Sequence, residues 1–138
     1  MSDEVRSPTQ EDFEWLKQAE MHILNLLRDR YSSAVFEHTE SDLKLCQRLL
    51  DDKDKMVRRE HTLELQCLGV VLGNVFVTNT SMRWARVINE YGDMLALHSQ
   101  RIEFTLYPLS MISKRVEEQR IVDMPALYRS LVADLGLA

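Results

Sequence analysis

The side chains best able to carry out catalysis or bind metals are scattered along this sequence, and none has the spacing of a known catalytic motif. The four histidines are His22, His38, His61 and His98. None of them has the HxxxH or HxH spacing that brings two imidazoles to one metal ion. The chain also lacks a GxSxG turn, a glycine-rich phosphate loop and a dinucleotide-binding fingerprint. We therefore expect a protein that is not an enzyme and that has no catalytic residues, no metal site and no other cofactor.

One group of polar and aromatic side chains could still form a ligand site. A tight turn around Gly92 would bring Tyr91 near the helix that follows Pro108, which carries Lys114 and Arg115. The free N–H groups at the start of such a helix attract anions. The candidate ligand-binding residues are Gln66, Trp84, Tyr91, Lys114 and Arg115. The alternative is that Tyr91 only packs the turn, while the two basic side chains pair with neighbouring glutamates on a solvated helix face.

The excess of acidic side chains indicates which partners the chain could bind. With 22 acidic and 17 basic residues the net charge is −5, so we expect no nucleic-acid partner, because binding phosphate requires a positive surface. Residues 1–60 hold 14 acidic and 10 basic side chains, a net charge of −4 that would suit a basic protein. The acids expected to contact it are Glu11, Asp12, Glu14, Glu37, Glu40, Asp42, Glu90 and Asp93. The alternative is that these acids are only the solvated faces of amphipathic helices.

Neither the N-terminus nor the cysteines indicate export or membrane insertion. The first residues are acidic and lack the basic and apolar regions of a secretory signal. The longest apolar stretch, residues 65–77, contains polar residues and is shorter than the ~20 residues that span a bilayer. Cys46 and Cys67 do not form a CxxC pair, so we expect two reduced thiols buried in the core. These features favour a cytoplasmic location and no membrane partner.

The first half of the chain is predicted to be helical. Apolar residues recur at helical spacing over residues 9–31, and Thr9 with Asp12 could cap the start of that helix. A second capping signature, Thr39 to Asp42, precedes a shorter helical pattern. Two helices are therefore expected before the apolar middle of the chain.

Residues 62–77 are ambiguous by composition, because their valines and phenylalanine also suit a strand. Their leucines nevertheless recur at helical spacing, which predicts a buried central helix. Gly69 and Gly73 lie four residues apart and would leave one strip of this helix without side chains. We expect another element to approach the helix closely along that strip.

After residue 80 the hydrophobic pattern alternates, which predicts strands. The expected strands are residues 83–89, 94–98 and 101–107. Pro108 would then begin a helix, and a last helix would start after Asp123 and end at Gly136. One buried cluster is expected to contain Leu68, Leu72, Trp84, Ile102, Phe104 and Leu106. The whole pattern predicts a single α+β domain over residues 1–138, with N-terminal helices and a central helix packed on a small antiparallel β-meander, followed by C-terminal helices.

A series of short motifs occurs in a fixed order between residues 60 and 118. They are Leu65-Gln66-Cys67-Leu68-Gly69-Val70-Val71-Leu72-Gly73, Trp84, Glu90-Tyr91-Gly92, Ala96-Leu97 and Pro108-Leu109-Ser110-Met111-Ile112-Ser113-Lys114-Arg115. In their order and spacing they resemble the bacterial domain-of-unknown-function family 3806. Asn89 departs from the acid expected before the Glu-Tyr-Gly turn. The resemblance implies a fold and a bacterial origin, and it implies no particular chemistry.

Two functions from different classes remain. The first is a protein-binding protein, most concretely an immunity protein that neutralises a bacterial toxin by direct binding. A nuclease-type toxin, such as one delivered by type VI secretion, carries a basic face that an acidic inhibitor could cover. The alternative is a small-ligand or anion-binding domain of unknown metabolic role. The sequence indicates no oligomeric state for either function.

Overall fold

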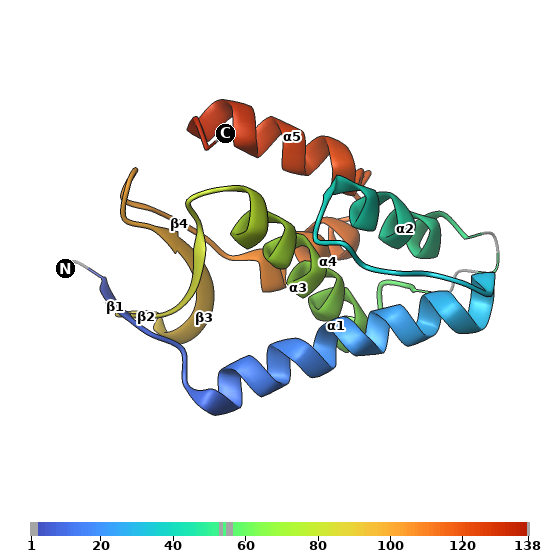
Figure 1. Cartoon of the computed structure of the whole chain (residues 1–138), viewed down its shortest axis with the longest axis horizontal. Helices are drawn as coiled ribbons and strands as arrows, with labels where there is room; N and C mark the ends of the chain where they lie inside the picture. The colour runs from blue at the N-terminus through green and yellow to red at the C-terminus, as the bar shows by residue number, and fades with distance from the viewer. Residues whose placement is uncertain (1–2, 53, 55–56, 138) are drawn as a thin grey trace.

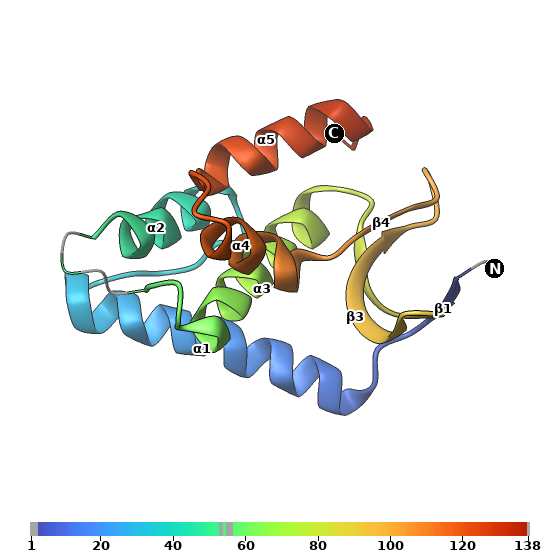
Figure 2. The same ribbon diagram turned by 180° about the vertical axis from the view of Figure 1, so that it is seen from behind.

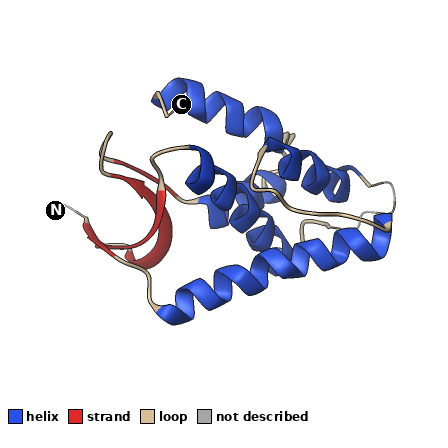
Figure 3. Ribbon diagram, viewed as in Figure 1, coloured by secondary structure: helices blue, strands red, loops and turns tan. Residues whose placement is uncertain are grey.

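The computed structural model describes residues 3–52, 54 and 57–137, which form five helices and one four-stranded sheet (Figure 3). The elements are β1 (Glu4–Arg6), α1 (Gln10–Tyr31), α2 (Glu40–Asp51), α3 (Thr62–Asn79), β2 (Arg83–Asn89), β3 (Gly92–Ser99), β4 (Phe104–Leu106), α4 (Pro108–Glu117) and α5 (Met124–Leu135). Met1 and Ser2, which begin the acidic N-terminal segment, lie outside the described residues. The α+β fold class is as the hydrophobic pattern predicts.

Helix α3 runs through the middle of the molecule and forms the centre of the core (Figures 1 and 2). Leu65, Leu68 and Leu72 are fully buried, because α3 contacts α1, α2, α4 and α5 around its circumference. A helix that is apolar on every side is stable only when it is covered on every side. The predicted buried central helix is therefore confirmed, and its composition does not make it a strand.

The sheet lies at one end of the molecule and curves so that its hollow face points away from the helices (Figures 1 and 2). Its strand order is β1-β2-β3-β4, and every neighbouring pair is antiparallel. The β2-β3-β4 part is the predicted meander. Trp84 of β2 lies opposite Leu97 of β3, and both are buried. The meander thus packs its apolar face on the helices, as expected of a half-covered antiparallel sheet.

The two glycines of α3 allow the close contacts that the sequence predicts. A Cβ atom at Gly69 would overlap the carbonyl oxygen of Pro108 and lie 2.8 Å from its carbonyl carbon. A Cβ atom at Gly73 would overlap the indole ring of Trp84. Gly69 therefore lets the start of α4 touch the α3 backbone, and Gly73 lets β2 do the same through its tryptophan.

The helix ends follow the predicted capping signals with one exception. Thr9 and Asp12 form a reciprocal capping box at the start of α1. The Asp123 side chain accepts a hydrogen bond from the third residue of its own helix, and Gly136 ends α5 in the left-handed conformation, with φ 63°. At α2, Thr39 occupies the N-cap position but makes no side-chain capping bond. The start of α2 is held differently, through the Asp42 carboxylate described below.

The last strand is shorter than predicted, and part of the predicted core is wrong. Residues 100–103 form a turn in which Glu103 has a φ of 51°, so only residues 104–106 remain in β4. Phe104, which pairs with the last residue of β3, is 39% exposed, and Ile102 is only partly buried. Leu106 is buried as expected. The alternating pattern correctly predicted a strand here. It extended, however, beyond the part of the sheet that the helices cover.

The structure also shows the apolar character of the helices and the state of the two cysteines. Within the described part of the chain, no helix combines the length and apolar character needed to cross a bilayer. Cys46 and Cys67 are both buried and both free. The predicted pair of free buried thiols is therefore confirmed.

Replacing Gly69 with alanine tests the close contact between α3 and α4. Alanine favours a helix interior over glycine by about 1 kcal/mol. Its Cβ would, however, overlap backbone atoms of Pro108 that cannot rotate away. We expect Gly69→Ala to lower the free energy of unfolding in urea by on the order of 1–3 kcal/mol. Thr78→Ala, at an exposed position of the same helix, is the control, and a Gly69→Ala variant as stable as that control would contradict the contact.

Candidate functional site

A cavity of about 360 Å³ lies between α1, α3, the β2–β3 hairpin and the first turn of α4. Asp12 and Trp15 line it from α1, and Gln66 lines it from α3. Arg86 of β2 and Asp93 of β3 contribute from the sheet. We refer to it as the Arg86 cavity. Its volume lies within the range of small-molecule sites in proteins, roughly 300–1,000 Å³.

The guanidinium of Arg86 is the charged centre of this cavity. Arg86 alternates with Trp84 and Ile88 along β2, so its side chain lies on the face of the sheet that packs on the helices. Its Nε donates to Asp12 Oδ2 at 3.0 Å, and a terminal nitrogen donates to the other oxygen of the same carboxylate. A second terminal nitrogen reaches Asp93 at 3.4 Å. Two carboxylates therefore hold one guanidinium, which fixes its direction within the cavity.

Asp12 links the start of α1 to β2. Its Oδ2 also accepts the backbone N–H of Thr9 at 2.8 Å, and its own N–H donates to the Thr9 hydroxyl at 3.1 Å. The hydrogen bonds from Arg86, reinforced by those from Thr9, outweigh the burial of the carboxyl and lower the pKa of Asp12 to about 2. The Asp12 side chain is thus ionised and bonded to the protein throughout the neutral range.

The remaining walls of the Arg86 cavity are apolar, with two uncharged polar groups. Trp15, Tyr107 and leucine side chains provide flat and aliphatic surface, while Gln66 and Ser110 provide an amide and a hydroxyl. Two carboxylates and one guanidinium leave a negative charge in excess, which disfavours an anion. The walls therefore suit a neutral or cationic molecule with an aromatic or apolar body. Among the residues that the structure describes, no cluster of three or more histidine, cysteine or acidic side chains could hold a metal ion.

The eight acids predicted to contact a partner have three different fates. Asp12 and Asp42 are buried, so neither lies where a partner could touch it, and the prediction is corrected for these two. Glu40 receives a hydrogen bond from Arg129 at 2.8 Å, and Asp93 pairs with Arg86 as described. The other four acids are exposed and form no salt bridge with any described residue. They are Glu11, Glu14, Glu37 and Glu90.

The burial of Asp42 has a local structural reason. Its two carboxylate oxygens accept the backbone N–H groups of Glu37 and His38, each at 2.9 Å. Burial nevertheless raises the pKa of this carboxyl. The side chain thus fastens the loop between α1 and α2 to the start of α2, while the backbone N–H of Asp42 donates to the Thr39 carbonyl at 3.0 Å.

The five predicted ligand residues do not come together in one place. Only Gln66 lines the Arg86 cavity. Trp84 packs on Gly73 and donates its indole N–H to Asn74 at 2.9 Å. Tyr91 is 82% exposed at the hairpin tip, Lys114 is exposed on α4, and Arg115 donates to a carbonyl of its own helix. The expected cluster of Tyr91 with the basic residues of α4 therefore does not form this site.

Arg86, Trp15 and Tyr107 are the cavity residues that sequence reasoning missed. A signal for Arg86 was present, because its position between Trp84 and Ile88 in an alternating strand places it on the apolar face. A charged residue on an apolar face needs a partner and is a candidate for a site. Nothing in the pattern near Trp15 or Tyr107 marks them, since their convergence depends on how α1 and α4 pack.

Acid titration of stability tests the Asp12–Arg86 ion pair. Folding lowers the pKa of Asp12 from 3.8 to about 2, so its ionised form stabilises the folded state above pH ~4 and this contribution is lost as the pH falls toward 2. Asp12→Asn should therefore lower the free energy of unfolding at pH 7 by on the order of 1–2 kcal/mol and should lose less stability below pH 4.

The matched control is Glu11→Gln, which removes the same charge from the neighbouring exposed position. Urea unfolding of the three proteins from pH 7 down to pH 2 measures the difference. Curves for Asp12→Asn and Glu11→Gln that run together over the whole range would contradict the ion pair.

The comparisons with known proteins place the chain in a family and show its fold elsewhere. The model of DUF3806, a domain of unknown function, matches residues 42–128. A crystal structure from Bacteroides thetaiotaomicron is similar with a TM-score of 0.83 at 14% sequence identity, over 97% of this chain and 48% of that chain. The present chain thus spans about half the length of that protein, and at this identity the likeness shows the fold alone. No curated protein matches. Since the family model covers more than half of its residues, the chain belongs to the DUF3806 family.

Proposed function

We propose that this domain is a non-enzymatic binding protein that takes a small neutral or cationic organic molecule in the Arg86 cavity. The observation that carries the proposal is the lining of this cavity, where aromatic walls surround a fixed ion pair with negative charge in excess. Trp15 and Tyr107 would stack on a flat ligand, and Gln66 would bond its polar edge. Asp93, whose side chain is more than half exposed, would attract a positive group at the entrance.

The bonding of Asp12 favours binding over acid–base catalysis. A general acid or base must change its protonation state near the working pH and must reach the substrate. Asp12 has a pKa of about 2, and both of its oxygens are already bonded to Arg86 and Thr9. Its carboxylate is thus suited to fix the guanidinium in place, and it is poorly suited to move a proton.

Two probes with the same aromatic body and opposite charge test the proposal. Tryptamine carries an amine, and indole-3-acetate carries a carboxylate. The protein has two tryptophans, Trp15 in the cavity and Trp84 against α3, whose indole N–H signals can be followed separately by NMR. We expect tryptamine to shift the Trp15 signal and leave that of Trp84 in place, and we expect indole-3-acetate to bind several-fold more weakly.

A matched pair of variants completes the test. Gln66→Leu removes an amide from the cavity and should weaken the shift at Trp15, whereas Gln18→Leu changes the same group at an exposed position of α1. A Trp15 signal that tryptamine does not move, or tighter binding of indole-3-acetate than of tryptamine, would rule out the proposed ligand class.

A second candidate function, binding of a basic protein, is favoured by one observation on α1. Phe13 is 49% exposed and stands between Glu11 and Glu14, which are exposed as well. An aromatic anchor within a charged rim is the usual composition of an interface hot spot. Neutralisation of a bacterial toxin would use this face, with the acids speeding the encounter and Phe13 providing affinity.

Co-expression with the toxic product of an adjacent gene tests this second function. Rescue of growth by the native chain, lost in Phe13→Ala and kept in Met21→Ala, would support it, because both side chains are exposed apolar residues of α1. Equal rescue by both variants, or no rescue by the native chain, would count against the face around Phe13.

A further inference from the structure

Strand β2 has an open edge that the first strand does not cover. Strand β1 pairs with β2 only from Arg86 to Ile88, although β2 already begins at Arg83. On its other side, β2 is paired along its whole length with β3. The segment Arg83–Ala85 therefore has no partner strand on the β1 side among the described residues. Backbone N–H and C=O groups along such an edge are available to another chain.

The chain leaves this edge for a local reason. Ser7 follows β1, and Pro8 comes next, which has no N–H to donate to a strand. Thr9 then caps α1 by its bonds with Asp12. The start of α1 thus ends β1 after three residues and keeps the segment Arg83–Ala85 uncovered.

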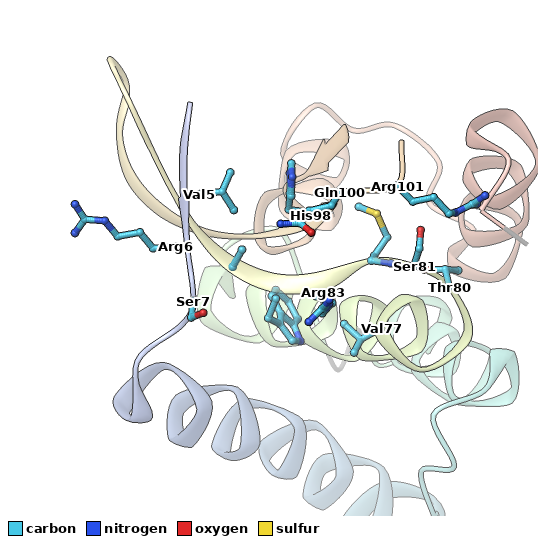
Figure 4. A pocket seen from close by; sticks show the side chains of 13 residues that line it. Val5, Arg6, Ser7, Val77, Thr80, Ser81, Arg83, His98, Gln100 and Arg101 are labelled. Carbon is cyan, nitrogen blue, oxygen red and sulfur yellow. Dashed lines mark hydrogen bonds between the residues drawn. The ribbon is translucent and has the colours of Figure 1, made fainter. Parts of the chain in front are cut away.

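A cavity of about 700 Å³ lies along this open edge (Figure 4). Ser7 borders it where β1 ends, Val5 and the half-buried Val77 give it accessible apolar surface, and the buried Met82 and Trp84 lie beneath. It shares no lining residue with the Arg86 cavity. The edge therefore adjoins both a hollow and apolar side chains, which an added strand could use for its own side chains.

This cavity is basic, although the protein carries a net charge of −5. Its lining contains Arg6, Arg83 and Arg101, together with His98, and it contains no acidic residue. Arg83 makes no ion pair with any residue that the structure describes. Arg101 donates from one nitrogen to the carbonyl of Gly136 at 2.7 Å, and it too makes no ion pair with a described residue. An occupant of this cavity should therefore be acidic.

The arrangement of the arginines favours an extended occupant over a compact one. Figure 4 shows Arg6 extending outward beyond β1 and Arg101 extending toward the C-terminal helix, with Arg83 between them. A single small anion could not contact all three guanidinium groups, whereas a stretched peptide could. We propose that an acidic peptide segment of another protein adds to the sheet along Arg83–Ala85, continuing the line of β1.

In this arrangement the peptide backbone bonds to the open edge of β2. Side chains alternate along a strand, so one set of the peptide's side chains meets the accessible apolar surface at Val77, and acidic ones meet the arginines. The contact with Glu4 does not prevent Arg6 from taking part, since both side chains are more than half exposed and such pairs contribute little.

A blocked peptide of alternating glutamate and valine is the probe for this edge. Fluorescence anisotropy of the labelled peptide measures its affinity for the full chain. Two matched peptides separate charge from strand addition, one with lysine in place of glutamate and one with N-methylated valines that keep the charge and lose backbone donors. We expect only the first peptide to bind, and we expect the backbone amides of β2 that point away from β3 between residues 83 and 85 to exchange more slowly in the complex.

Charge reversal locates the site on the protein. Arg83→Glu should weaken binding by about tenfold, whereas Arg120→Glu, at an exposed position after α4, should leave it unchanged. Equal binding of the N-methylated peptide would overturn strand addition and leave only attraction between the acidic peptide and the arginines. Binding that tolerates Arg83→Glu, or no binding of the acidic peptide at all, would overturn the proposal altogether.

Discussion

The ion pair between Asp12 and Arg86 is the contact on which the surroundings of both cavities depend. Asp12 closes the capping box with Thr9, so it determines where β1 stops and α1 begins. The same carboxylate holds Arg86, and with it the N-terminal end of α1 is fixed against β2. One side of this junction is the Arg86 cavity, and the other is the open edge of β2. The buried carboxylate of Asp12 therefore links the start of α1, the open edge of β2 and the Arg86 cavity.

The second constraint is the absence of side chains at two positions of α3. Gly69 lets the carbonyl of Pro108 reach the helix backbone, and Gly73 receives the ring of Trp84. These contacts bring α4 and β2 to the same helix, with Gln66 less than one turn before Gly69. The Arg86 cavity is the space that remains between these elements. Packing against glycine thus positions Gln66, Tyr107 and Arg86 around one volume without any bond among the three.

Local patterns in the sequence were sufficient for most elements and insufficient for the site. Periodicity and capping residues predicted the five helices and the β-meander, because each depends on neighbours within a few residues. Strand β1 was missed, since three exposed residues carry no pattern of their own and gain their structure from pairing with β2. Phe104 was misplaced because an alternating pattern predicts which side chains share one face of a strand. It does not predict how far the helices extend over that face. The cavity was missed for the same kind of reason, as it needs residues from five elements, α1, α3, β2, β3 and α4, that only the tertiary packing brings together.

The most direct test of the central role of Asp12 and Arg86 is a double-mutant cycle on these two residues. Asp12→Asn keeps an oxygen for the N–H of Thr9 and removes the charge, while Arg86→Gln removes the guanidinium, so the cycle isolates the ion pair from the helix cap. Urea unfolding at pH 7 of the native chain, both single variants and the double variant gives the coupling free energy. We predict a coupling of about 1–3 kcal/mol, with the second substitution costing much less than the first. Additive effects, with a coupling near zero, would contradict the pair as the link between α1 and the sheet.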